Sequence, residues 1–236
     1  MSVFARLGQF VSIATSGAIS GVIEAVRTVF EGDPETRRRV AFSVAMIALS
    51  AKMAKADGIV TPDEVVAFQE IFEIPDKEAH NVARLYNLAK RDVAGFESYA
   101  TKMADLCNSS GKNGLFLEDI LDGLFHIAKA DGVLHEKERN FLARIAEIFH
   151  IEETNFEQII ARHTYETTHD PYAVLGLSRD TPFEEIKRHY RRLVSEAHPD
   201  RLVARGVPEE FLAIANSRMA ALNTAFAEIE REKRVA

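Results

Sequence analysis

Residues 181–200 read TPFEEIKRHYRRLVSEAHPD, and this stretch decides the fold of the C-terminal part of the chain. Apolar residues recur at helical spacing from Phe183 to Ala197 and form one narrow stripe when the sequence is placed on a helical wheel. Thr181 is the expected helix cap, Pro182 the first helical residue and Glu184 an acidic residue of the first turn. The stretch therefore predicts an amphipathic helix that buries one face.

The end of this helix is set by a proline. Pro199 disfavours the helical conformation in the residue before it and has no backbone N–H to donate, so the helix is predicted to end at His198. The tripeptide His198-Pro199-Asp200 is then expected to project from a loop.

Four basic residues share the face of the helix that turns away from the apolar stripe. They lie next to one another on the helical wheel with no acidic residue between them, which is typical of a solvated surface or a docking face. These residues are Lys187, Arg188, Arg191 and Arg192.

A second long helix follows the tripeptide. Its apolar seam steps by three and four residues and predicts that the helix returns antiparallel to the first. The seam comprises Phe211, Ala215, Met219, Leu222, Phe226 and Ile229. Together the two helices present His198-Pro199-Asp200 at the tip of a hairpin, beside the basic face.

This arrangement resembles a J domain over residues 170–236. The resemblance rests on the tyrosine, leucine and glycine pattern of Tyr172–Leu177, the basic helix with Tyr190, the run HPDR from His198, and Leu222-Asn223 before Phe226. It implies a co-chaperone that binds a DnaK-type heat-shock chaperone and accelerates its ATP hydrolysis. In that family His198, Pro199 and Asp200 are indispensable, the basic helix gives electrostatic docking, and the protein is not itself an enzyme.

Upstream, residues 36–165 contain an internal repeat, which points to a duplicated architecture. The run KADGIV from Lys55 recurs as KADGVL from Lys129. In each copy an apolar helix is expected to end at Asp-Gly and a second helix to start a few residues later. The prediction is an all-α, duplicated helical bundle, joined by a polar linker over Thr164–Asp170 to a small helical-hairpin J domain over residues 169–236.

The bundle resembles the TerB-like domain of DjlA-type co-chaperones. TerB-like domains are proposed to bind divalent cations, so the repeated carboxylates Asp57, Glu64, Asp131 and Glu138 are weak metal candidates. The spacing does not fit an EF-hand loop, because lysine occupies an expected ligand position in both copies. Helix capping explains Glu64 equally simply, because Thr61 and Glu64 have the spacing of a capping box. The sequence favours capping over metal.

Two functions remain open at this point. The first is a J-domain co-chaperone in which the TerB-like domain gives localisation or partner selection. The alternative is a TerB-type stress or divalent-metal sensor that recruits the chaperone machine. No cofactor is expected, since the sequence shows no nucleophile and base pair, phosphate-binding loop or metal cluster.

The composition indicates which class of partner and which cellular compartment to expect. With 36 Asp and Glu against 29 Lys and Arg the net charge is -7, which argues against nucleic acid as a partner. A single cysteine, Cys107, is typical of a reducing compartment, so the cytoplasm is expected. The expected partners are the DnaK-type chaperone and client proteins.

Residues 1–35 form an apolar leader. The charge-free run from Leu7 to Ile23 includes several Ser, Thr and Gly residues, so its hydropathy falls short of a typical membrane-spanning helix. A flexible or amphipathic leader is the favoured reading. Association with a membrane through residues 1–30, at the cytoplasmic face of the inner membrane, is the alternative.

Overall fold

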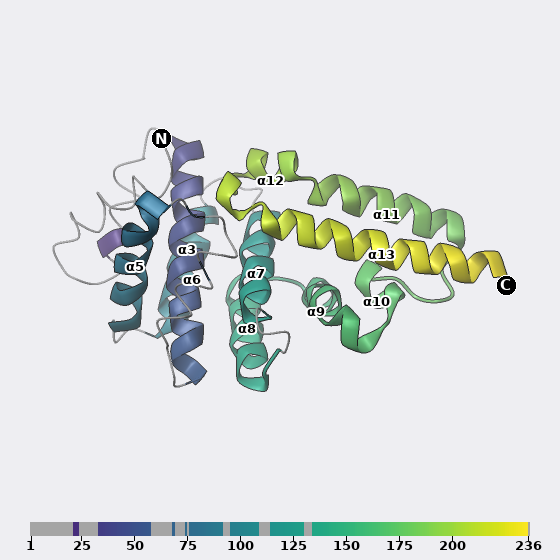
Figure 1. Ribbon diagram of the computed structural model, residues 1–236, viewed down its shortest axis with the longest axis horizontal. Helices are drawn as coiled ribbons and strands as arrows, with labels where there is room; N and C mark the ends of the chain where they lie inside the picture. The colour runs from purple at the N-terminus through teal and green to yellow at the C-terminus, as the bar shows by residue number, and fades with distance from the viewer. Residues whose placement is uncertain are drawn as a thin grey trace.

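The computed structural model describes residues 21–23, 33–57, 68, 74, 76–91, 95–108, 114–129 and 134–235. These residues are mostly helical and include no strand, which confirms the all-α class (Figure 1). The helices are α3 (Pro34–Asp57), α5 (Asp76–Arg91), α6 (Phe96–Asn108), α7 (Gly114–Ala128), α8 (Glu136–Ile148), α9 (Glu153–Thr168), α10 (Pro171–Leu175), α11 (Phe183–Ala197), α12 (Pro199–Arg205), the 3-10 helix η1 (Glu209–Phe211) and α13 (Ala213–Val235).

Helix α3 is the centre of the N-terminal bundle. Every residue from Val40 to Met53 is buried, as expected of a helix that is apolar on all sides and surrounded by others. The hydroxyls of Ser43 and Ser50 donate hydrogen bonds to carbonyls one turn earlier, so these two polar side chains are satisfied inside the core. Helices α5, α6, α7 and α8 all pack against α3 (Figure 1).

The core of the bundle is completed by the C-terminal part of the chain. The ring of Phe42 meets Phe116 edge to face at 5.7 Å and Phe211 at 5.1 Å. Phe211 was expected to open the seam of the return helix. It lies instead in η1, with Pro208 before it, and α13 begins at Ala213. The short 3-10 turn directs the Phe211 ring into the N-terminal core.

The polar linker expected over Thr164–Asp170 was wrong. Helix α9 continues to Thr168, and the Thr164 hydroxyl donates to the Ile160 carbonyl at 2.9 Å. The first five residues of this segment continue the helix, and His169 ends it in the left-handed conformation with φ 47°. Only His169 and Asp170 separate α9 from α10.

Helices α11 and α13 lie side by side and run antiparallel, as predicted (Figure 1). Helix α11 starts one residue later than expected. Pro182 is the cap residue in place of Thr181, because the Pro182 carbonyl already accepts the first helical hydrogen bonds, from Glu185 and Ile186. Thr181 therefore does not cap the helix.

A second, smaller core lies between α9, α10, α11 and α13. Its buried residues are Ala161, Tyr172, Val174, Leu175, Ile186, Ala197, Leu222, Ala225 and Ile229. The predicted apolar stripe of α11 supplies Ile186 and Ala197, and its partly buried members Tyr190 and Leu193 pack at the edge. The stripe prediction is confirmed.

Few of residues 1–35 belong to the described part of the chain. Val22 and Ile23 are helical and buried in the core of the bundle, with exposed fractions of 0% and 5%. Among the described residues, no helix combines the length and the apolar character that crossing a membrane requires.

Candidate functional site

The tripeptide lies where the chain turns from α11 into α12. His198 has an extended conformation, with φ -62° and ψ 135°, so α11 stops at Ala197. Pro199 is the first residue of α12, a position that needs no N–H donor and matches the fixed φ of proline. The helix end at His198 is confirmed, since Pro199 has the effect that its chemistry predicts.

The tripeptide is not a loop, which corrects the expectation from the sequence. His198 caps α12: its Nδ1 accepts a hydrogen bond from the Asp200 backbone N–H at 3.2 Å, and its carbonyl accepts from Arg201 at 2.8 Å. The sequence after Pro199 contains enough helix formers for two turns before Gly206. The local backbone is therefore ordered by its own hydrogen bonds.

The side chains of the tripeptide reach solvent. The Asp200 side chain is 91% exposed and the His198 side chain 50% exposed, with His198 Nδ1 at 3.6 Å from Asp200 Oδ2. Two residues further on, Leu202 is fully buried in the bundle core. The turn is thus anchored on its inner side and open on its outer side, which leaves the His-Pro-Asp surface accessible to another protein.

The basic face of α11 is present and largely exposed. Arg188, Arg191 and Arg192 are exposed and Lys187 is half-buried. Arg192 bonds Glu196 at 3.4 Å and the ring of His189 at 3.1 Å, so its charge is partly compensated within the helix. Across the described part of the chain, the other three make no ion pair, and they present unpaired positive charge next to the tripeptide.

The opposite side of α11 is held against α13 by aromatic contacts. The rings of Tyr190 and Phe226 stack with centroids 4.1 Å apart and an angle of 7° between planes. The Tyr190 hydroxyl donates to Asn223 Oδ1 at 2.8 Å. These contacts fix the rotation of α11 about its axis, and so determine the direction in which its basic face points.

Of the four metal candidates, only Glu138 has a side chain among the described residues. Glu138 accepts a hydrogen bond from the His135 backbone N–H at 3.0 Å, which is the helix-capping role. Glu64, Asp131 and the side chain of Asp57 lie outside the described residues. Within the described ranges, no three His, Cys, Asp or Glu side chains are placed to hold a metal ion.

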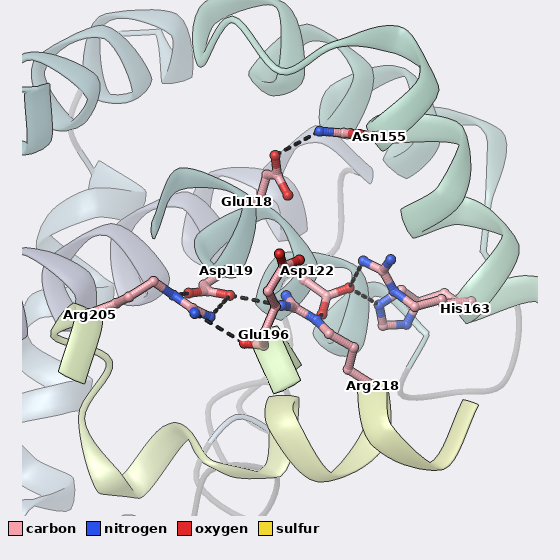
Figure 2. A network of polar contacts seen from close by, with 9 residues as sticks. Glu118, Asp119, Asp122, Asn155, His163, Glu196, Arg205 and Arg218 are labelled. Carbon is pink, nitrogen blue, oxygen red and sulfur yellow. Dashed lines mark hydrogen bonds and ion pairs between the residues drawn. The ribbon is translucent and has the colours of Figure 1, made fainter. Parts of the chain in front are cut away.

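A buried network that the sequence analysis missed joins the two halves of the chain. Asp119 and Asp122 of α7 face Arg205 of α12 and Arg218 of α13 (Figure 2). Arg218 bonds both carboxylates, at 2.9 Å to Asp119 and 2.7 Å to Asp122. The one available signal was a group of acidic residues, Glu118, Asp119 and Asp122, on a largely apolar helix, where a buried carboxylate requires a partner.

The charges of this network shift the pKa values of its members. Burial alone raises the pKa of Asp122, but Arg218, Arg162 and the hydrogen bond from His163 outweigh burial and hold that pKa well below its usual range. Burial lowers the pKa of Arg218, and the two carboxylates reverse this and raise it. Both groups therefore remain charged in the folded protein.

Glu118 is the neighbour that does not join the cluster. Its side chain points away from Asp119 and Asp122 and accepts a hydrogen bond from Asn155 of α9 at 2.9 Å (Figure 2). Burial raises the pKa of Glu118. Glu118 thus contacts α9, Asp119 contacts α12 and α13, and Asp122 contacts both α9 and α13.

Comparisons with protein families match two domains in order. Residues 43–161 match the model of the tellurite resistance protein TerB, and residues 170–227 match the DnaJ domain. The second match contains the tripeptide, the basic face and all of α11, and it covers α13 as far as residue 227.

Individual relatives resemble the chain over most of its length. A co-chaperone protein DjlA from Photobacterium profundum is 29% identical over 83% of this chain and 79% of the relative. A co-chaperone protein DjlA from Coxiella burnetii is 28% identical over 76% of this chain and 73% of the relative. A co-chaperone protein DjlA from Photorhabdus laumondii is 34% identical over 50% of this chain and 51% of the relative. No solved structure matches the chain.

Proposed function

Because the chain belongs to the DjlA-like co-chaperones, with a TerB domain followed by a DnaJ domain, we propose that it binds a DnaK-type heat-shock chaperone and stimulates its ATP hydrolysis. Proteins of this kind are not enzymes themselves; they act on the ATPase of their partner. The observation that carries the proposal is the exposed His198-Pro199-Asp200 turn beside the basic face of α11.

The tripeptide is proposed to be the contact that triggers hydrolysis. His198 and Asp200 offer an imidazole and a carboxylate on a turn whose backbone is already ordered by the cap hydrogen bond. Pro199 removes the backbone freedom that binding would otherwise have to restrict. A rigid polar turn of this kind loses little conformational entropy when a partner binds it.

The basic face is proposed to guide docking. Lys187, Arg188 and Arg191 fit an acidic surface on the partner, and exposed charges of this kind speed association more than they strengthen the complex. Arg192 contributes less, since Glu196 and His189 already engage it. The resulting complex is transient and sensitive to salt, as a protein that acts repeatedly on its partner requires.

The TerB domain is proposed to give the chain its location or its choice of partner. The chain is further proposed to act on the cytoplasmic side, where residues 1–30 associate with the inner membrane. An ATP-dependent partner and a single cysteine support this compartment. Since Val22 and Ile23 are buried in the core, the test is co-sedimentation with anionic vesicles of the full chain and of the chain lacking residues 1–20. Equal vesicle binding by both would contradict the role of this segment.

Steady-state ATP turnover by a purified DnaK-type chaperone tests the main proposal. The intact chain is expected to raise turnover, and His198→Gln or Asp200→Asn to return it to the basal rate. The matched control is Asp180→Asn, which removes an exposed carboxylate near the opposite end of α11. The proposal fails if the intact chain leaves turnover unchanged, or if Asp200→Asn stimulates as well as Asp180→Asn.

A further inference from the structure

Arg205, the last residue of α12, connects three segments of the protein. Its Nε and Nη2 donate to the two carboxylate oxygens of Asp119 in the TerB domain, at 2.7 and 3.0 Å. Its Nη1 donates to the backbone carbonyl of Glu196, in the last turn of α11, at 3.0 Å. Figure 2 shows these bonds converging on one guanidinium group.

These contacts lie on both sides of the His-Pro-Asp turn. Glu196 comes two residues before His198, and Arg205 comes five residues after Asp200. The segment before the turn and the segment after it are therefore both held to the same carboxylate through the Arg205 side chain. This carboxylate is part of the other domain, because Asp119 belongs to α7.

The anchor itself cannot move freely. Asp119 is fully buried, and its Oδ1 also accepts from Arg218 Nη1 at 2.9 Å, so both carboxylate oxygens are engaged. Bidentate pairing between arginine and carboxylate fixes orientation as well as distance. Lysine cannot reproduce this pairing, since its ammonium acts as a compact point charge.

Packing around α12 supports the same restraint. Leu202 and Val207 are fully buried in the core of the TerB bundle. Gly206, which ends α12 at φ 106°, approaches α3 so closely that an added Cβ would lie 2.8 Å from the Cβ of Arg38. The inner side of α12 is thus embedded in the TerB domain, while Asp200 faces solvent.

We propose that Asp119 and Arg205 are positioning residues for the stimulation of the chaperone, and that the TerB domain sets the orientation of the His-Pro-Asp turn. This inference rests on the proposed function. Neither residue touches the partner: Asp119 is buried and Arg205 acts through the backbone on either side of the turn. Their loss is expected to lower the maximal stimulation and to leave docking, which the basic face provides, nearly unchanged.

The first test is a titration of a DnaK-type chaperone with the intact chain, Arg205→Lys and Arg218→Lys. Arg205→Lys should lower the maximal stimulation about tenfold while the half-saturating concentration changes by less than about twofold. Arg218→Lys is the matched control: it weakens the same buried network, but it leaves in place the Arg205 bonds to Asp119 and to the Glu196 carbonyl. It should keep most of the maximal stimulation.

The second test does not depend on the chaperone. Amide hydrogen exchange of Gly206 and Val207, whose N–H groups bond Val203 and Leu202 at the end of α12, should accelerate about tenfold in Arg205→Lys and stay near the intact value in Arg218→Lys. Equal maximal stimulation by Arg205→Lys and the intact chain, or unchanged exchange in α12, overturns the inference. If the intact chain does not stimulate, the proposed function fails and the exchange experiment alone decides whether Arg205 restrains the turn.

Discussion

The Nε of Arg218 lies 2.7 Å from Oδ2 of Asp122, so a buried ion pair ties α13 of the DnaJ domain to α7 of the TerB domain. The two residues are 96 positions apart in the sequence. Their side chains are 10% and 2% exposed, which places the pair out of reach of bulk water. A buried pair of this kind is costly to break from one side, because the remaining buried charge loses a partner that compensates for its lost hydration.

Removing the carboxylate should therefore destabilise the protein. Asp122→Asn removes the carboxylate that pairs with Arg162 and one of the two that pair with Arg218, and we expect the free energy of unfolding at neutral pH to fall by roughly 3–5 kcal/mol. Urea unfolding followed by circular dichroism measures the change. Asp180→Asn, an exposed carboxylate, should change it by less than about 0.5 kcal/mol.

The same pair predicts how stability depends on pH. Since the folded state holds the pKa of Asp122 well below 3.8, the carboxylate stabilises the protein above pH 3.8, and this contribution is lost as the pH falls from 3.8 through the lower folded-state pKa. Unfolding free energies measured at several acidic pH values should fall more steeply in the intact chain than in Asp122→Asn. If the unfolding free energies of the two proteins fell in parallel with pH, Asp122 would not be the group that causes the loss of stability in acid.

Gly206 gives a prediction about backbone conformation. Alanine there would adopt φ 106° and its Cβ would meet the Cβ of Arg38 at 2.8 Å, so we expect Gly206→Ala to cost about 1–3 kcal/mol and to lower the melting temperature. Gly176→Ala is the comparison, because Gly176 also has positive φ but its nearest neighbour is the flexible side chain of Gln158 at 3.2 Å. A larger loss at Gly176 would contradict this account.

Two variants of Tyr190 separate the stability contributed by its hydrogen bond from that contributed by ring packing. Tyr190→Phe loses the bond to Asn223 and keeps the stack on Phe226, so it should cost about 0.5–1.5 kcal/mol. Tyr190→Ala loses both and should cost roughly 2–4 kcal/mol, because half-buried aromatic area is lost as well. Thermal and urea unfolding measure both variants. Equal costs would mean that the stack contributes nothing.

The basic face of α11 predicts that the concentration needed to stimulate the chaperone ATPase depends on salt. Arg191→Glu should raise the concentration needed for half-maximal ATPase stimulation several-fold at low ionic strength, with the difference shrinking as salt screens the charges. The maximal stimulation should remain unchanged, since the tripeptide is intact. Arg231→Glu reverses an exposed charge on α13 and should have little effect. A salt-independent effect of Arg191→Glu would argue against electrostatic docking.

The DnaJ domain was largely predictable because its signals are local. The stripe from Phe183 to Ala197 identifies α11, and Pro199 ends it, since both depend on residues within a few positions of one another. The error at Thr181 is one residue, as helix boundaries depend on which carbonyl accepts the first bond. The short helix α12 was missed because a proline predicts where one helix stops more readily than where another starts.

The buried network could not be derived in the same way. Asp119 and Arg205 are 86 positions apart, and no periodic pattern links residues in two different domains. The linker prediction failed for a related reason: the polar residues of Thr164–Asp170 suit either a loop or the exposed side of a helix. Tertiary contacts favour the helix, because Ala161 and Tyr165 of α9 pack in and against the smaller core.

Helix α9 contributes to both cores: Phe156 and Ile159 to the larger one, and Ala161 to the smaller one. A fragment designed to keep the whole smaller core should therefore begin at Glu153, since a cut at Asp170 would discard Ala161 and Tyr165. The smaller core therefore begins before residue 170, where the DnaJ match starts.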